Sequence, residues 1–158
     1  MNKTVVLFDI DYTIFDTKVF KDSGLTNYSL YTEVLPVLQK LKGIVDLGIF
    51  SKGVHEFQNT KLDKTAIGDF FVKDNVHIFE DKDINISKVL ERYKDYKVFL
   101  VDDKLSVLFQ AKTHNPAVFS VWVKRGPFAE SQEPIANFSP DMTIENLSLL
   151  PEIIQQNS

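Results

Sequence analysis

Carboxylate side chains occur as two close pairs, each of which directly follows a short apolar run. Asp9 and Asp11 follow the first such run, and Asp102 and Asp103 follow the fourth. Alternate residues of an extended chain share a face, so Asp9 and Asp11 are expected to point the same way. Two like charges about 4 Å apart repel by roughly 4 kcal/mol at an effective dielectric of about 20. A cluster of all four carboxylates therefore requires either protonation or a bound cation.

The residue types available limit which cation this would be. The chain has no cysteine and only three histidines, so thiolate sites are excluded. Carboxylate oxygens favour a hard ion, and a few carboxylates with waters and a phosphate are typical of magnesium. We therefore predict a Mg²⁺ site that draws on Asp9, Asp11, Asp102 and Asp103.

A magnesium ion among carboxylates still needs an anionic substrate, and the second apolar run is followed by groups that could bind one. Ser51, Lys52 and the backbone N–H groups of residues 51–54 lie where the next helix begins, and helix N-termini bind phosphoryl groups. A lysine is also needed to offset the charge shared by the phosphoryl group and the attacking carboxylate. Two candidates, Lys82 and Lys88, lie before the fourth apolar run.

The elements that position these residues follow from hydrophobic periodicity. Continuous rather than alternating apolar runs predict strands that are covered on both faces, as in a parallel sheet. Five such runs occur, and a weaker sixth could form an edge strand; they cover residues 5–8, 44–50, 76–79, 98–101, 118–123 and 142–144.

Helical patterns separate the apolar runs, at residues 36–43, 54–64, 87–93, 105–112 and 145–154. We expect Pro36 at the first helical position, Gly43 as a C-cap and Ser87 as an N-cap. Strand–helix alternation with short links predicts an α/β doubly wound, Rossmann-like fold with helices on both faces of the sheet. In such folds ligands bind outside the carboxyl ends of the strands, which is where the acidic pairs fall. Residues 124–141, rich in proline, are expected to form a surface excursion.

Composition restricts the class of protein. The 158 residues match one ordinary domain, and 44% apolar with 25% charged residues is typical of a soluble globular chain. The net charge of −4 does not indicate a nucleic-acid partner. No N-terminal apolar run resembles a signal peptide, and none approaches the roughly 18 residues that span a bilayer. We expect a cytoplasmic protein with no membrane partner, and the sequence leaves its oligomeric state open.

Four segments resemble, in order, the motifs of the haloacid dehalogenase (HAD) superfamily of phosphatases and phosphotransferases. They cover residues from about 4 to 125 and read FDIDYT, GIFSKG, FEDKDINISK and VFLVDDKLSVLFQAK. The resemblance implies a single HAD-like catalytic domain over residues 1–158. It also implies a mainly parallel sheet of about five strands in the order 5-4-1-2-3, which places the two acidic pairs side by side.

The resemblance assigns roles to the acidic residues. Asp9 would be the nucleophile that forms an aspartyl phosphate, and Asp11 would be the general acid and then the general base. Asp103 would bind Mg²⁺ directly, beside Asp9 and the backbone carbonyl of Asp11. Asp102 would act on the metal through a water molecule.

The same resemblance assigns the phosphate-binding groups. Ser51 would bind the phosphoryl oxygens, with Lys52 beside it. Lys82 fits the spacing of the family's lysine better than Lys88, which lies closer to Asp102 than is usual.

The chain has little room for the cap domain that many members carry. Residues 16–32 and 54–81 are the usual insertion points, and neither reaches the roughly 40 residues of an independent fold. We expect a minimal cap or none, with at most a small flap from residues 15–29. The resemblance thus implies a Mg²⁺-dependent phosphomonoester hydrolase whose phosphorylated substrate is a small molecule or an exposed phosphate on a macromolecule. A phosphotransferase or mutase of the same superfamily, or a non-catalytic protein that binds phosphate and magnesium, remains as an alternative.

Overall fold

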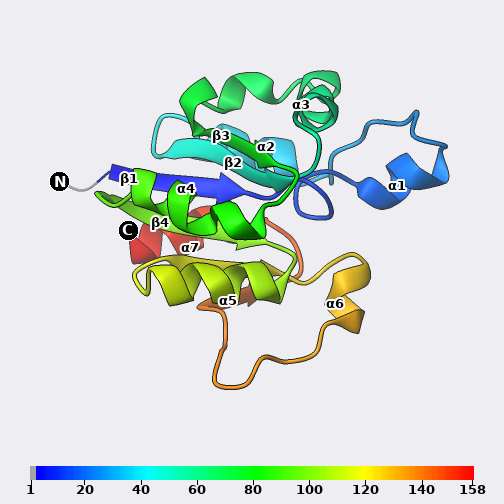
Figure 1. Ribbon diagram of the computed structural model, residues 1–158. Coiled ribbons are helices and arrows are strands. Elements are labelled where there is room, and N and C mark those ends of the chain that lie inside the picture. The colour runs from blue at the N-terminus through cyan, green and yellow to red at the C-terminus, as the bar shows by residue number, and fades with distance from the viewer. Residues whose placement is uncertain (1–2) are drawn as a thin grey trace.

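The computed structural model describes residues 3–158, and it contains one sheet of six parallel strands (Figure 1). The strand order is β3-β2-β1-β4-β5-β6, which confirms the predicted order and adds one strand at the edge. The five main strands are present as predicted, and the weak run at residues 142–144 forms the sixth, edge strand by pairing with β5. The strands are β1 (Lys3–Phe8), β2 (Asp46–Lys52), β3 (Val76–Phe79), β4 (Tyr96–Asp102), β5 (Phe119–Val123) and β6 (Met142–Ile144).

Seven α-helices within residues 3–158 connect or follow the strands. They are α1 (Thr17–Asp22), α2 (Val34–Leu41), α3 (His55–Lys64), α4 (Ile86–Arg92), α5 (Leu105–His114), α6 (Pro127–Ser131) and α7 (Leu150–Asn157). Short 3₁₀ turns lie at Gly68–Phe70, Lys73–Asn75 and Asp83–Asn85. None of the helices in this part of the chain combines the length and the apolarity that a bilayer crossing requires.

Two helix starts differ from the prediction. The helix α2 begins at Val34, so Pro36 is its third residue rather than its first. The first turn tolerates this, because its N–H groups have no partner inside the helix. The helix α4 begins at Ile86 with Asn85 as N-cap, since the preceding 3₁₀ turn runs directly into it and leaves Ser87 inside the helix. The predicted glycine stop after α2 is present, with Gly43 at a φ of 82°.

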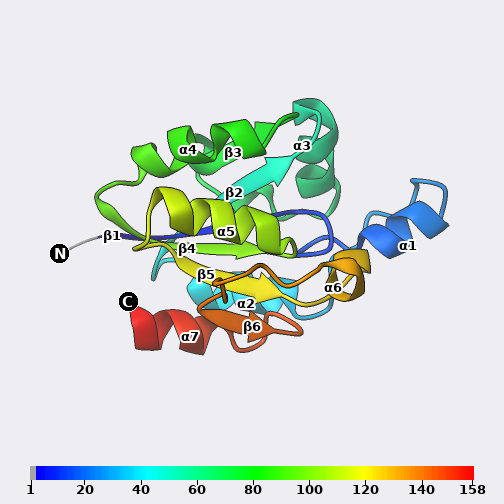
Figure 2. The ribbon, with the colours of Figure 1, turned by 60° about the horizontal axis from the view of Figure 1, so that its bottom comes forward.

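Helices cover both faces of the sheet, as predicted (Figure 2). Successive residues of β1 point to opposite faces, so the strand contributes to two hydrophobic cores. Val6 and Phe8 pack in the core with α2 and α7, whereas Val5 and Leu7 pack in the core with α4 and α5. This double burial explains why the strand residues are continuously apolar.

The centre of the sheet brings the two acidic pairs together. Strands β1 and β4 are neighbours with Phe8 opposite Val101, and the backbone N–H of Asp9 donates to the carbonyl of Val101 at 3.0 Å. The residues that follow the two strands therefore meet at the same edge. Figure 1 shows α1 projecting beyond this edge, at the carboxyl ends of the strands.

The segment 124–141 is more than a surface excursion. It contains α6, and Gln132 after that helix binds back to the β4–α5 connection. The Gln132 side chain accepts from the N–H of Leu105 at 2.6 Å and donates to the carbonyl of Asp103 at 3.0 Å. A segment distant in sequence thus fixes the backbone of one acidic pair.

Candidate active site

Three buried carboxylates form the centre of the site. Asp9 lies just after β1, Asp102 ends β4, and Asp103 follows it; their exposed fractions are 8%, 1% and 2%. One oxygen from each lies within 4.8 Å of the others. The fold therefore assembles three of the four carboxylates predicted to cluster.

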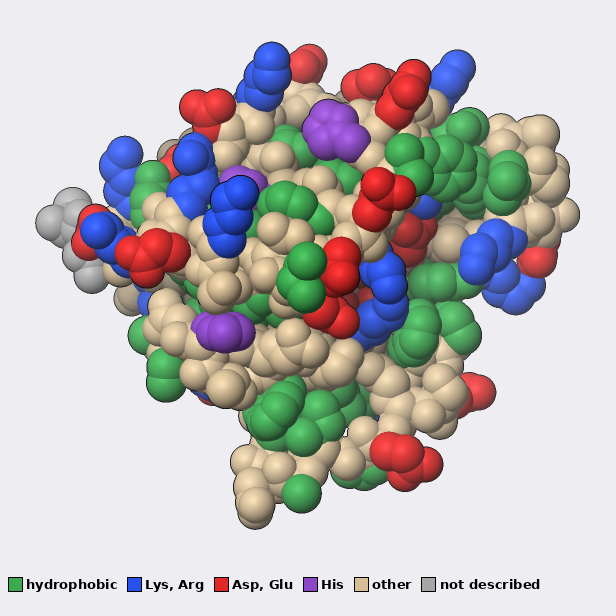
Figure 3. Space-filling view, viewed as in Figure 1, with side chains coloured by type: hydrophobic (Ala, Val, Ile, Leu, Met, Phe, Trp, Pro, Cys, Tyr) green, Lys and Arg blue, Asp and Glu red, His purple; other side chains and the backbone are tan. Residues whose placement is uncertain are grey.

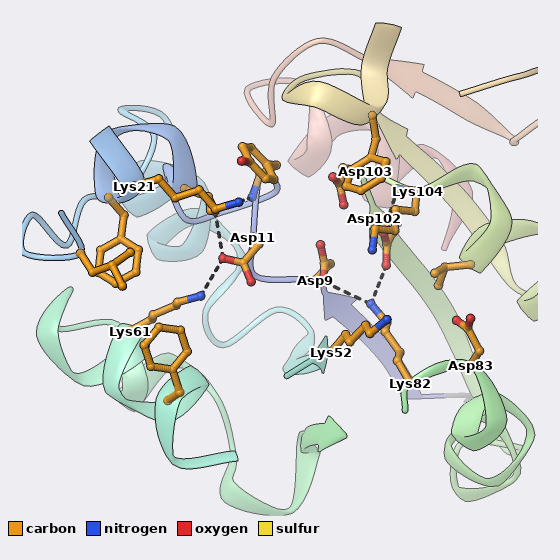
Figure 4. A pocket seen from close by; sticks show the side chains of 17 residues that line it. Asp9, Asp11, Lys21, Lys52, Lys61, Lys82, Asp83, Asp102, Asp103 and Lys104 are labelled. Atoms are coloured by element: carbon orange, nitrogen blue, oxygen red, sulfur yellow. Dashed lines mark hydrogen bonds and ion pairs between the residues drawn. The ribbon is translucent and has the colours of Figure 1, made fainter. Parts of the chain in front are cut away.

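Lys82 provides the positive charge at this centre. Its ammonium group donates to Asp102 at 2.6 Å and to Asp9 at 3.2 Å, and the side chain is 3% exposed (Figure 4). Burial alone would lower the pKa of Lys82, but the carboxylates of Asp102 and Asp9 outweigh burial and raise it. Lys88 is exposed on α4, so of the two lysines that the sequence offered, Lys82 is the one at the carboxylates.

The carboxylates are not fully compensated by Lys82. Burial, together with the charges of Asp9 and Asp102, raises the pKa of Asp103 to about 10. Burial and the charge of Asp102 raise the pKa of Asp9 to about 6. The centre is thus an electrostatically strained cluster that a cation would relieve.

The carboxylate oxygens of this cluster that have no protein partner are suited to a metal ion. Both oxygens of Asp102 are used, one by Lys82 and the other by the backbone N–H of Lys104 at 2.9 Å. In contrast, Oδ2 of Asp103 is buried and has no hydrogen-bond partner among the described residues. An unpaired buried carboxylate oxygen is costly in the absence of a ligand. The donor set is all oxygen, so it suits a hard divalent cation with Asp103, rather than Asp102, as the direct ligand.

Asp11 does not join the cluster, contrary to the expectation that it shares a face with Asp9. The strand ends at Phe8, and Tyr12 already has a φ of 62°, so strand alternation does not extend to Asp11. Its carboxylate turns toward α3 and binds Lys61 at 2.7 Å (Figure 4). It also accepts from Thr17 at 2.9 Å and from the Gln58 amide at 3.0 Å. Both oxygens of Asp11 are thus bonded to protein groups.

Ser51 does not line the cavity. It is fully buried near the end of β2, and its hydroxyl accepts from the Gln58 amide at 2.8 Å. Gly53 makes this possible, because a Cβ there would lie 2.8 Å from Cγ of Gln58. The predicted contact between Ser51 and a phosphoryl group remains a prediction. Lys52, the last residue of β2, lines the cavity.

A cavity of about 430 Å³ opens above the carboxylates. Figure 3 shows acidic and basic side chains side by side in the right half of the view, with apolar side chains above and below them. The lining residues come from the loop after β1, from α1, α3, α5 and α6, and from the strand ends. The flap predicted from residues 15–29 thus contributes to the wall through α1, which carries the lining residues Thr17, Phe20 and Lys21.

Sequence reasoning missed Gln58 and Lys61, which are 1% and 4% exposed on α3. Their spacing of three residues places them on one face of a helix. The helix that follows Ser51 carries these two long polar residues on one face, and this pattern could have marked them as candidate site residues. Only the tertiary structure shows that this face contacts Asp11.

The sequence matches no family model and no curated protein, whereas comparison with solved structures gives clear matches. A protein described as haloacid dehalogenase-like from Burkholderia xenovorans is 21% identical with a TM-score of 0.82, and the match covers 99% of each chain. A HAD-hydrolase from Bacillus subtilis, solved bound to magnesium, is 14% identical with a TM-score of 0.76 over 98% of this chain and 99% of that one. An L-2-haloacid dehalogenase from Xanthobacter autotrophicus, solved with chloropropionic acid covalently bound, is 13% identical with a TM-score of 0.74 over 97% and 98%.

These matches agree with the fold that the four sequence motifs imply. The resemblance drawn from the sequence is confirmed at the level of the fold. Over nearly its whole length, the chain has the fold of the haloacid dehalogenase-like hydrolases.

Proposed function

We propose that the protein is a Mg²⁺-dependent phosphomonoester hydrolase that works through an aspartyl phosphate. The observation that carries the proposal is the unpartnered, buried Oδ2 of Asp103 beside Asp9, Asp102 and Lys82. Three carboxylates with one lysine favour a divalent cation as well, and a phosphate ester is the substrate class that uses magnesium, lysine and a nucleophilic carboxylate together.

In the first step, an oxygen of Asp9 forms a bond to phosphorus while the bond from phosphorus to the leaving oxygen breaks. The leaving oxygen takes a proton from Asp11. In the second step, Asp11 takes a proton from water as the water oxygen bonds to phosphorus. The bond between phosphorus and Asp9 then breaks, and inorganic phosphate leaves.

The other charges hold the phosphoryl group during both transfers. A magnesium ion held by Asp9, Asp103 and the backbone carbonyl of Asp11 would neutralise charge on the phosphoryl oxygens. Lys82 adds a second positive charge, and it is kept in place by Asp102. The N–H of Lys104 in turn orients Asp102.

The proton-transfer role requires a local rearrangement. Asp11 is bonded to Lys61 and Gln58, so its carboxyl group has to exchange one of these partners for the substrate. Both partners lie on α3, one turn apart. A small shift of α3 would therefore free Asp11 from both at once.

The test is hydrolysis of an aryl phosphate by the wild type, by Asp9→Asn and by Asp95→Asn. Asp95 is exposed at the opposite end of β4, so Asp95→Asn serves as a matched control. We expect activity that requires Mg²⁺, is lost with EDTA, and falls about a thousandfold or more only in Asp9→Asn. Acid quenching should trap labelled phosphate on the wild-type chain.

Two results would refute the proposal. One is full activity in Asp9→Asn after deamidation has been excluded by mass spectrometry. The other is chloride release from 2-chloropropionate without phosphate-ester hydrolysis, which would make the protein a dehalogenase. Transfer of the trapped phosphate to a second alcohol, faster than to water, would instead assign the phosphotransferase reaction.

A further inference from the structure

The cavity above the carboxylates has two apolar walls that the hydrolytic chemistry does not use. One wall combines Phe20 of α1, Leu25 after it and Phe57 of α3, and the rings of Phe20 and Phe57 lie 6.1 Å apart. The opposite wall combines Val107 of α5 and Phe128 of α6. Leu25 and Phe57 are 52% and 43% exposed and both line the cavity, so their apolar surface is available to a ligand.

Three lysines of the cavity have no carboxylate partner among residues 3–158. They are Lys21, Lys52 and Lys104, whereas Lys61 and Lys82 are paired with acidic residues. The ammonium group of Lys104 lies 4.6 Å from the centre of the Phe128 ring, and that of Lys21 lies 5.7 Å from the Tyr12 ring. Figure 4 shows Lys21 on one side of Asp9 and Lys104 on the other. Positive charge therefore flanks the acidic centre on both sides.

The size of the cavity restricts what fits between these walls. About 430 Å³ lies in the lower part of the range of 300–1,000 Å³ that holds small ligands. Residues of α1, α3, α5 and α6 wall the cavity on several sides. The volume and the apolar walls together favour a small molecule over a macromolecular phosphate.

We propose that the substrate is a small phosphomonoester whose body carries a ring-sized apolar group and a second anionic group. This inference rests on the proposed function, because it assumes that the phosphoryl group binds at Asp9 and Lys82. The apolar group lies between Phe57 and Phe128. The second anion binds Lys21 or Lys104, each of which lies over an aromatic ring at the side of the cavity.

Binding of phosphonates, which cannot be hydrolysed, tests the inference without turnover. We would titrate the Mg²⁺-loaded protein with methylphosphonate, phenylphosphonate and 4-carboxyphenylphosphonate by calorimetry. Burial of one ring predicts that phenylphosphonate binds about tenfold more tightly than methylphosphonate. The added carboxylate should give a further gain of about threefold to tenfold that declines with salt.

Matched variants assign each gain to its residues. Phe57→Ala or Phe128→Ala should abolish the advantage of the phenyl group, whereas Phe109→Ala should keep it. Phe109 is a fair control because it is 38% exposed on α5 but does not line the cavity. Lys21→Gln or Lys104→Gln should abolish the carboxylate gain, and Lys88→Gln, on the exposed face of α4, should not.

The outcomes separate this inference from the proposed function. If no phosphate ester is hydrolysed but the phosphonates bind in the expected order, the site takes this ligand class and the hydrolase proposal fails. If an aryl phosphate is hydrolysed but the three phosphonates bind equally, the substrate inference is wrong. It is also wrong if Phe109→Ala changes the ranking as much as Phe57→Ala does.

Discussion

Lys61 is a lysine that is almost completely buried among aromatic rings. The side chain is 4% exposed, and its ammonium group lies 4.8–5.6 Å from the centres of the Phe57, Phe15 and Phe20 rings. Asp11 is its only carboxylate partner in the described chain. The ring faces attract the cation, but they do not replace the hydration that burial removes. Burial of the charged Lys61 side chain in the folded protein therefore depends on its ion pair with Asp11.

This dependence predicts an asymmetric effect of removing either partner. Asp11→Ala should lower the free energy of unfolding by about 3 kcal/mol, because it leaves a buried cation unpaired. Lys61→Met keeps the packing of the side chain on the rings and leaves a partly exposed carboxylate, so it should cost only about 1 kcal/mol. Urea unfolding of the two variants and the double variant measures the coupling. We expect the double variant to be more stable than Asp11→Ala; equal losses in the two single variants would contradict the dependence.

The residue types and their spacing were sufficient to predict that Asp9, Asp102 and Asp103 lie together with a lysine, whereas the preference for Lys82 over Lys88 came from the resemblance to the HAD motifs. Each is placed by a strand end, or by the segment before the fourth strand, and strand ends follow from apolar runs. The contacts of Asp11 could not be predicted, because they depend on how α3 lies over the loop after β1.

At the scale of elements, the β5–α6 connection supports the loop after β1. Gly126 lies against Tyr12, and a Cβ on Gly126 would lie 2.6–2.8 Å from atoms of the Tyr12 side chain. Tyr12 follows Asp11 and lines the cavity. This support was not visible in the sequence, where residues 124–141 lacked any periodic pattern that would place them near the site.

A pair of glycine variants tests this contact. Gly126 and Gly43 both have positive φ values, 79° and 82°, but Gly126 also has a ψ of −174°, a region that is essentially restricted to glycine, and a Cβ on Gly43 would meet nothing within 4 Å. Gly43→Ala should therefore lower the free energy of unfolding by only about 1 kcal/mol, because alanine disfavours the left-handed backbone conformation. It should leave aryl phosphate hydrolysis unchanged. Gly126→Ala should cost more in urea unfolding, and it should lower kcat/KM about tenfold by displacing Tyr12. Equal behaviour of the two variants would show that the contact with Tyr12 has no role.

At the scale of the whole molecule, continuous apolar runs predicted strands that are covered on both faces, whereas the order of the five main strands was expected from the resemblance to the HAD superfamily. The sixth strand was harder to predict, since Met142 and Thr143 are exposed and only Ile144 is buried. The sequence indicated that the carboxylates repel one another, but not how deeply the fold buries them. Three carboxylates with one lysine are buried at the centre of the sheet, and they oppose folding unless a cation is present.

Two neighbouring substitutions should therefore change global stability in opposite directions. Asp103→Asn removes a carboxyl group whose pKa is raised to about 10, so the folded state no longer has to retain a proton or bury a charge. Without metal at about pH 8, it should raise the free energy of unfolding by about 2 kcal/mol. Asp102→Asn should lower the free energy of unfolding by about 3 kcal/mol, because an uncharged amide would replace the carboxylate that pairs with the buried ammonium group of Lys82.

The pH and metal dependence complete this prediction. A raised carboxyl pKa means that the folded state binds the proton more tightly, so the contribution of Asp103 to wild-type stability falls as pH rises from about 4 toward about 10. The advantage of Asp103→Asn should thus grow with pH in that window. Burial and Arg92 lower the pKa of His77 to about 4, so His77 stays neutral above about pH 7 and does not obscure the comparison.

Adding Mg²⁺ should stabilise the wild type and have little effect on Asp103→Asn, because Mg²⁺ would supply the charge that Oδ2 of Asp103 lacks. Thermal unfolding with and without Mg²⁺ measures the difference, and equal shifts in the two proteins would place the metal away from Asp103.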